Sequence, residues 1–208
     1  MLSKLKYFIR QSWLLLFSSF FFGMLIAVTN AALSDRIEQN RIAKLNALTK
    51  ALLPTAERFQ PVEADIEIRL PDGAKEKATI VEAFSGDGQR VGWSFNARGI
   101  GFAGPIELVI AVDKDFQKIM GYNVLASSET PGFGDQVKSD YYRKQFINAP
   151  AERLTLVKTG SAAAIDSQIV AITGATVTSQ AVVNIINTFL TQIKDQMQKK
   201  GAIGNVSQ

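Results

Sequence analysis

The 208-residue chain contains no cysteine and no histidine. Without cysteine it can form neither a disulfide framework nor a thiolate-held zinc or iron–sulfur site. Without histidine it lacks the usual proton shuttle of neutral pH and the commonest ligand of zinc, copper and haem. A redox function in this chain would therefore need an organic cofactor.

Charge is also missing from one long stretch. No charged residue lies between Gln11 and Ser34, and the centre of that stretch reads WLLLFSSFFFGMLIAV. A helix of about 20 apolar residues is long enough to cross about 30 Å of hydrocarbon. Residues 11–33 are therefore predicted to form a transmembrane helix.

The flanks of this helix predict its orientation. Lys4, Lys6 and Arg10 precede it, and cytoplasmic flanks are usually the positive ones. Residues 1–10 are expected in the cytoplasm, with the bulk of the chain on the periplasmic side of the inner membrane. A cleaved signal peptide ending at the TNA of residues 29–31 would be a competing interpretation, but the apolar run is longer than a signal core.

Positive charge elsewhere is slight. The formal net charge is +4, and the three N-terminal cations leave +1 for the remaining chain. Nothing in this balance indicates a nucleic-acid surface.

The rest of the chain divides by periodicity. Residues 34–60 are expected to be a membrane-proximal helix, ended by Pro54, and a linker. Residues 61–200 should form an α+β domain, an antiparallel sheet with flanking helices, and residues 201–208 a tail. The strand segments are predicted from alternating or short apolar runs at Ile66–Leu70, Lys77–Phe84, 91–95, Ile106–Val112, Phe116–Leu125 and Ile169–Ile172.

Two glycine-containing segments stand between these strands. ARGIGFAGP, residues 97–105, lacks the following helix that phosphate-binding glycine loops need, so a strand crossover or bulge is expected there. SSETPGFGDQV, residues 127–137, reads as a loop that leads into a short amphipathic helix capped by Asp140.

ITGATVTSQAVVNII, residues 172–186, places four hydroxyl side chains at the start of a helical pattern. Thr178 or Ser179 is a natural helix N-cap. A helix N-terminus also favours anions, so a phosphate at Thr176 would meet favourable electrostatics. From the residues alone, helix capping is the favoured interpretation, and chemical attachment is the alternative. The four hydroxyls belong to Thr173, Thr176, Thr178 and Ser179.

TGATVTS resembles the flavinylation signature of the FMN-binding domain family, in which the last Thr of the [S/T]-G-A-T motif carries FMN through a phosphoester bond. GYNVL…ETPGFGD, residues 121–135, and GFAGPIELVIAV, residues 101–112, resemble two further signatures of that family, in the same order. With one N-terminal membrane segment, the whole chain is similar to the G subunits of Rnf-type electron-transport complexes.

The resemblance implies a membrane-anchored flavoprotein subunit that relays electrons through FMN attached to Thr176. Such complexes couple ferredoxin:NAD electron transfer to sodium or proton translocation, and the subunit is not catalytic alone. The implied partners are other subunits of the complex, a flavin-attaching transferase and the lipid membrane. Phe133 and Tyr122 are possible surfaces for the flavin ring. The cofactor-binding residues are expected to be Thr176, Thr173, Gly174, Ala175, Val177, Glu129, Thr130 and Gly132.

Two positions depart from the family pattern. Val170 stands where an Asp is common, and Ser127 stands where a His is common. These departures favour a membrane-anchored scaffold without flavin as the rival function. The sequence also leaves open a member similar to the C subunits of sodium-translocating NADH–quinone reductases, and a cleaved, soluble ligand-binding protein.

Overall fold

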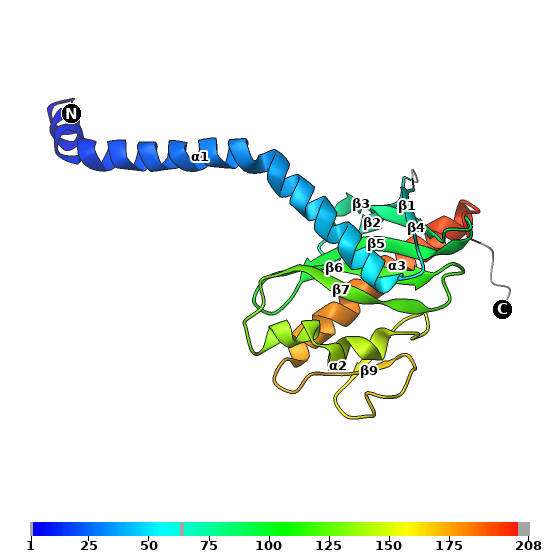
Figure 1. The fold of residues 1–208 in the computed structure, drawn as a ribbon. Helices are drawn as coiled ribbons and strands as arrows, with labels where there is room; N and C mark the ends of the chain where they lie inside the picture. Colours follow the sequence, from blue (N-terminus) through cyan, green and yellow to red (C-terminus); the bar gives the residue numbers. More distant parts are fainter. Residues whose placement is uncertain (1, 63–64, 204–208) are drawn as a thin grey trace. The chain divides into compact units, whose positions relative to one another are not determined.

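A computed structural model describes residues 2–62 and 65–203. The chain divides into two units, Met1–Lys44 and Leu45–Gln208. Most of the expected C-terminal tail, residues 204–208, lies outside the described residues. The first unit is helical and the second holds a mixed α+β fold, as the sequence predicts (Figure 1).

Helix α1, Leu2–Leu52, contains the long apolar run. Among the described residues, one segment, Arg10–Leu52, is long and apolar enough to cross a membrane, and none of its most apolar window is buried. The large side chains from Trp13 to Val28 are exposed. This composition and exposure fit a single-pass membrane anchor.

The domain is built on a five-stranded antiparallel sheet in the order β1-β4-β5-β6-β7. A separate hairpin pairs β2 with β3, and β8 pairs with β9 in parallel. The strands of the main sheet are β1 Arg58–Pro61, β4 Ile80–Phe84, β5 Arg90–Ile100, β6 Pro105–Asp113 and β7 Ile119–Ser127. The smaller pairs are β2 Glu67–Arg69 with β3 Lys75–Lys77, and β8 Thr155–Val157 with β9 Gln168–Val170.

Helix α3, Thr176–Lys199, covers one face of this sheet and packs on β5. Alternate side chains of β6 point to that face because strand side chains alternate with a period of two. Together with the apolar stripe of α3 they make the main core. Its members include Phe95, Ile106, Leu108, Ile110, Val112, Val182, Ile186, Phe189 and Ile193.

The opposite face of the sheet packs against the end of α1. Leu53 and Ala56 form a small apolar cluster with Ala83 and Ala111. The hydroxyls of Thr49 and Ser94 are 3.2 Å apart and buried. The Asn123 amide donates to the Leu48 carbonyl at 3.2 Å. The last turns of α1 are therefore an integral part of the domain.

Several local expectations were wrong. The run Lys77–Phe84 is not one strand, because it splits between β3 and β4 in different sheets. β7 begins at Ile119 and not at Phe116, which occupies a turn with a positive φ of 54°. β1 and β8 were not predicted. The glycine stretch is neither a crossover nor a bulge; it is a hairpin connection closed by a hydrogen bond from Gly101 N to Gly104 O, 2.8 Å.

The segment after the second glycine loop is not a single amphipathic helix. It forms three short pieces, η1 Gly134–Lys138, α2 Asp140–Arg143 and η2 Lys144–Phe146. Asp140 is not an N-cap, since Ser139 occupies that position and makes no side-chain capping bond. Asp140 instead forms an ion pair with Arg143 at 2.6 Å. That pair holds the pKa of the Asp140 carboxyl below its usual value.

Candidate cofactor site

The strand-to-helix turn after β9 is held by its own backbone. Ala175 N donates to Ile172 O at 3.0 Å. Gly174 has a φ of +81°, and a Cβ there would meet nothing within 4 Å. Glycine is therefore required by the left-handed conformation and not by crowding.

Helix α3 begins without a hydroxyl cap. Its N-cap is Ala175, which makes no side-chain capping bond. The expectation that Thr178 or Ser179 caps the helix is wrong, because both lie inside it. The Ser179 hydroxyl donates to Ala175 O at 2.9 Å and accepts from Ile172 N at 3.1 Å. It braces the turn from the inside and is fully buried.

Tyr142 supports the same turn from α2. Its hydroxyl donates to the Ser179 carbonyl at 3.2 Å. Burial raises the pKa of this hydroxyl, so the neutral donor form persists at neutral pH.

The two other hydroxyls of the group face outward. Thr173 is exposed, and Thr176, the first residue of α3, is half-buried. Within the described part of the chain, neither hydroxyl takes part in a hydrogen bond, and the N–H groups of Thr176, Val177 and Thr178 have no acceptor. The first turn of a helix leaves such N–H groups unpaired, and they favour an anion.

The second wall of the site is organised by Glu129, which is 6% exposed. Its Oε1 accepts from the backbone N–H groups of Phe102 at 2.6 Å and Ala103 at 3.1 Å. Its Oε2 accepts from the Thr178 hydroxyl at 2.9 Å. One carboxylate thus joins the β5–β6 connection, the 127–137 loop and the first turn of α3.

Two glycines make room for this carboxylate. A Cβ on Gly101 would overlap Glu129 Oε1, and a Cβ on Gly134 would overlap Glu129 Oε2. Gly134 also lies close to the Thr178 hydroxyl. Any side chain at either position would displace the carboxylate from its donors.

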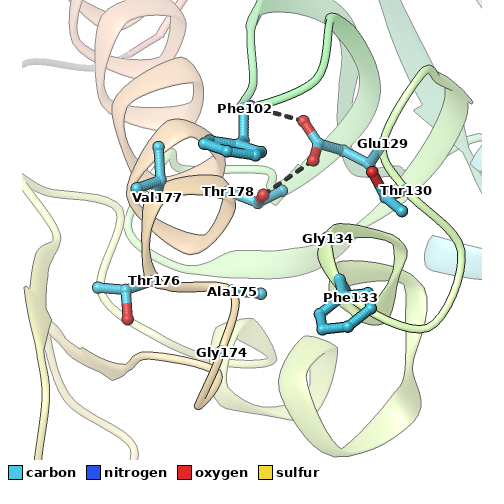
Figure 2. A pocket seen from close by; sticks show the side chains of 10 residues that line it. All are labelled: Phe102, Glu129, Thr130, Phe133, Gly134, Gly174, Ala175, Thr176, Val177 and Thr178. Atoms are coloured by element: carbon cyan, nitrogen blue, oxygen red, sulfur yellow. Dashed lines mark hydrogen bonds between the residues drawn. The ribbon is translucent and has the colours of Figure 1, made fainter.

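These segments line an open cavity of about 480 Å³. Figure 2 shows the rings of Phe102 and Phe133 on different sides of it, with Thr176 at the strand-to-helix turn, away from Glu129. Phe102 and Phe133 are 72% and 63% exposed. The lining residues are Phe102, Glu129, Thr130, Phe133, Gly134, Gly174, Ala175, Thr176, Val177 and Thr178.

The structure thus brings together most of the residues expected from the sequence. Thr173 and Gly132 do not line the cavity. Tyr122 is not a surface for a ring, because it is buried and donates to Val137 O at 2.6 Å. Phe133 does line it.

Phe102, Gly134 and Thr178 line the cavity but were not among the expected site residues. All three fall within the quoted signatures, which is the signal that could have found them. Within the described residues, no group of three or more His, Cys, Asp or Glu side chains could hold a metal ion.

Comparison with known proteins identifies this arrangement. Residues 101–191, which hold both walls of the cavity, match the FMN-binding domain family. The G subunit of the proton-translocating ferredoxin:NAD(+) oxidoreductase complex of Clostridium ljungdahlii is 30% identical over 84% of this chain and 85% of its own. The chain belongs to this G-subunit family.

Other members of the family agree. The G subunit of the ion-translocating oxidoreductase complex of Methanosarcina acetivorans is 27% identical over 83% of this chain and 87% of its own. The G subunit of the Na(+)-translocating ferredoxin:NAD(+) oxidoreductase complex of Acetobacterium woodii is 29% identical over 78% of this chain and 80% of its own.

Solved structures with a similar fold come from the C subunits of another class of complex. NqrC of Shewanella oneidensis superposes with a TM-score of 0.54 at 22% identity, covering 72% of this chain and 73% of that one. The C subunit of the Na(+)-translocating NADH-quinone reductase of Parabacteroides distasonis gives 0.56 at 19% identity, covering 77% and 96%. At these identities the likeness shows that the two kinds of subunit share a fold.

Proposed function

We propose that this chain is the flavoprotein electron-transfer subunit of an Rnf-type membrane complex and carries FMN through a phosphoester to the Thr176 hydroxyl. One observation carries the attachment site. Of the four clustered Ser and Thr residues, Thr176 is the one that lines the cavity and whose hydroxyl makes no hydrogen bond within the described residues. Thr178 and Ser179 are committed to internal bonds, and Thr173 lies outside the lining.

The residues present fit the group. The unpaired N–H groups of Thr176, Val177 and Thr178 offer donors to a phosphate on the neighbouring oxygen. Phe102 and Phe133 offer apolar faces to a ring system. Gly174, with open space around its Cα, leaves the approach to Thr176 clear. Bound FMN supplies the acceptance and release of one or two electrons.

The attachment needs a separate enzyme. Forming the ester removes a proton from the Thr176 hydroxyl, a weak nucleophile unless a base is adjacent. The sole carboxylate among the described lining residues, Glu129, already accepts three hydrogen bonds. We therefore include a flavin-attaching transferase among the partners of this chain.

The anchor sets the location. α1 would hold the domain at the membrane, with residues 11–33 spanning it and residues 61–200 forming the FMN-binding domain. The cations Lys4, Lys6 and Arg10 favour a cytoplasmic N-terminus and a domain on the periplasmic side. There the flavin would exchange electrons with other subunits in ferredoxin:NAD electron transfer coupled to sodium or proton movement. Both ions occur in the names of relatives.

Intact mass and in-gel fluorescence test the attachment. The full chain is co-expressed with a flavin-attaching transferase and denatured, and its band is viewed under ultraviolet light. Wild type should fluoresce and gain the mass of one FMN less one water. Thr176→Ala should lose both signals, while Thr173→Ala, a matched change at the exposed hydroxyl, should keep both.

Different results would favour a different function. A dark wild-type band under these conditions would favour the flavin-free scaffold, in keeping with Val170 and Ser127. A fluorescent Thr176→Ala would contradict the attachment site. Release of the chain from membranes by a salt wash would favour a cleaved signal peptide over an anchor.

A further inference from the structure

Glu129 is the one charged residue among the described residues that line the cavity. No ion pair within the described part of the chain involves it. Its three donors are two backbone amides and a hydroxyl, all neutral. The cavity wall therefore carries a negative charge that no neighbouring cation cancels.

The arrangement holds this carboxylate in one position. Its two oxygens accept hydrogen bonds from the N–H groups of Phe102 and Ala103 and from the Thr178 hydroxyl. The Glu129 carboxylate fits between Gly101 and Gly134 because neither residue has a side chain. Because it is tethered to three segments, the charge cannot swing into solvent.

We propose that Glu129 sets the flavin's midpoint potential, because its fixed negative charge in the cavity opposes reduction of the ring. This inference rests on the proposed function. A bound ring that took up two electrons and one proton would gain one net negative charge. The fixed charge of Glu129 would raise the free energy of that form more than that of the oxidised form, and would so lower the potential.

The size of the effect follows from Coulomb's law. At a separation of about 10 Å and an effective dielectric constant of about 20, one like charge would change the reduction equilibrium roughly tenfold. For a two-electron couple a tenfold change corresponds to about 30 mV.

Glu129→Gln removes the charge and keeps the geometry. The amide oxygen can still accept from the N–H groups of Phe102 and Ala103. The amide NH₂ can donate to the Thr178 hydroxyl oxygen, which accepts as well as donates.

The matched control is Glu152→Gln, which removes an exposed carboxylate. This carboxylate is far from the cavity. Its neighbour Ala151 accepts a hydrogen bond from Lys194, and Lys194 lies about 27 Å from Thr176 along α3, at 1.5 Å per residue.

The test is spectroelectrochemical titration of the full chain carrying covalent flavin, with intact mass confirming the attachment in each variant. Glu129→Gln should raise the midpoint potential by about 30 mV or more, a tenfold shift in the equilibrium. Glu152→Gln should leave it unchanged. Thr178→Val keeps the charge of Glu129, so it should shift the midpoint potential far less than Glu129→Gln does.

A flavin-loaded Glu129→Gln with an unchanged or lower potential would overturn this inference and leave the proposed function standing. Wild type without attached flavin would overturn both.

Discussion

The hydrogen bond between Thr178 and Glu129 gives the sharpest test of the site, because it can be removed without changing volume. Thr178→Val replaces a buried hydroxyl by a methyl group of similar size. The carboxylate then keeps two donors of three, and Oε2 is left without a partner within the described residues.

A hydrogen bond to a charged group contributes about 1.5–3 kcal/mol to the free energy of unfolding. In a domain the size of Leu45–Gln208, each kcal/mol lost from the free energy of unfolding lowers the melting temperature by about 2–4 °C. Thr178→Val should therefore lower the melting temperature by about 3–12 °C. Thr173→Val is the same chemical change at an exposed hydroxyl and should alter stability by about 0.5 kcal/mol or less.

The assay is thermal unfolding of the flavin-free full chain in detergent, followed by tryptophan fluorescence in a Trp13→Phe background. Trp93, 2% exposed in the core, then reports alone on the domain. In the Glu129→Gln background, Thr178→Val should be less destabilising, because the charge that needed the donor is gone. The reasoning fails if Thr178→Val and Thr173→Val melt alike, or if their difference persists unchanged in that background.

Two further predictions follow from the same region. Gly134→Ala should lower the free energy of unfolding by about 3 kcal/mol or more, since its methyl group would displace the Glu129 carboxylate from its donors. Gly132→Ala places its Cβ in open space at a φ of +79°, so it should lower the free energy of unfolding by only about 1–2 kcal/mol in urea titrations. Equal losses in the two variants would contradict the clash between a residue-134 side chain and Glu129. Burial raises the pKa of the Tyr122 and Tyr142 hydroxyls above the ordinary tyrosine value of 10. Above pH 10 these hydroxyls lose their protons in the unfolded chain and keep them in the folded one, so the unfolded chain binds fewer protons. Stability should fall there by up to about 1.4 kcal/mol per pH unit for each tyrosine, and Tyr142→Phe should remove about half of that slope in urea midpoints between pH 9 and 11.

Regular alternation made much of the sheet predictable from the sequence. β6 was predictable for a different reason: residues 108–112 form a short apolar run, because the sheet is covered on both faces and all five are buried. β1 escapes prediction because three of its four residues are exposed and give no such pattern. β8 has three residues and exists because β9 lies beside it, which no local pattern encodes.

The site was predictable where its residues are neighbours in sequence and hidden where they are not. The turn around Gly174 is evident from the sequence because its residues are contiguous. The pairing of Glu129 with Thr178 joins positions 49 residues apart, and Thr178 alone looks like a helix cap. The glycine pattern around Phe102 predicts a bulge or crossover, and this prediction was wrong. The backbone N–H groups of Phe102 and Ala103 bind the Glu129 carboxylate, which comes from a distant loop, and only the fold brings these groups together.

The missing helix cap explains why the hydroxyls divide into two roles. A Ser or Thr at the N-cap would accept a hydrogen bond from an N–H of the first turn and stabilise the helix by about 1 kcal/mol. Ala175 stands there instead, so those N–H groups stay unpaired beside Thr176. Residues 176 and 178 are separated by about 200° around the helix axis, since each residue turns about 100°. The bond to Glu129 therefore holds Thr178 against the inner wall and turns Thr176 outward, where a phosphate could reach both its oxygen and the free amides.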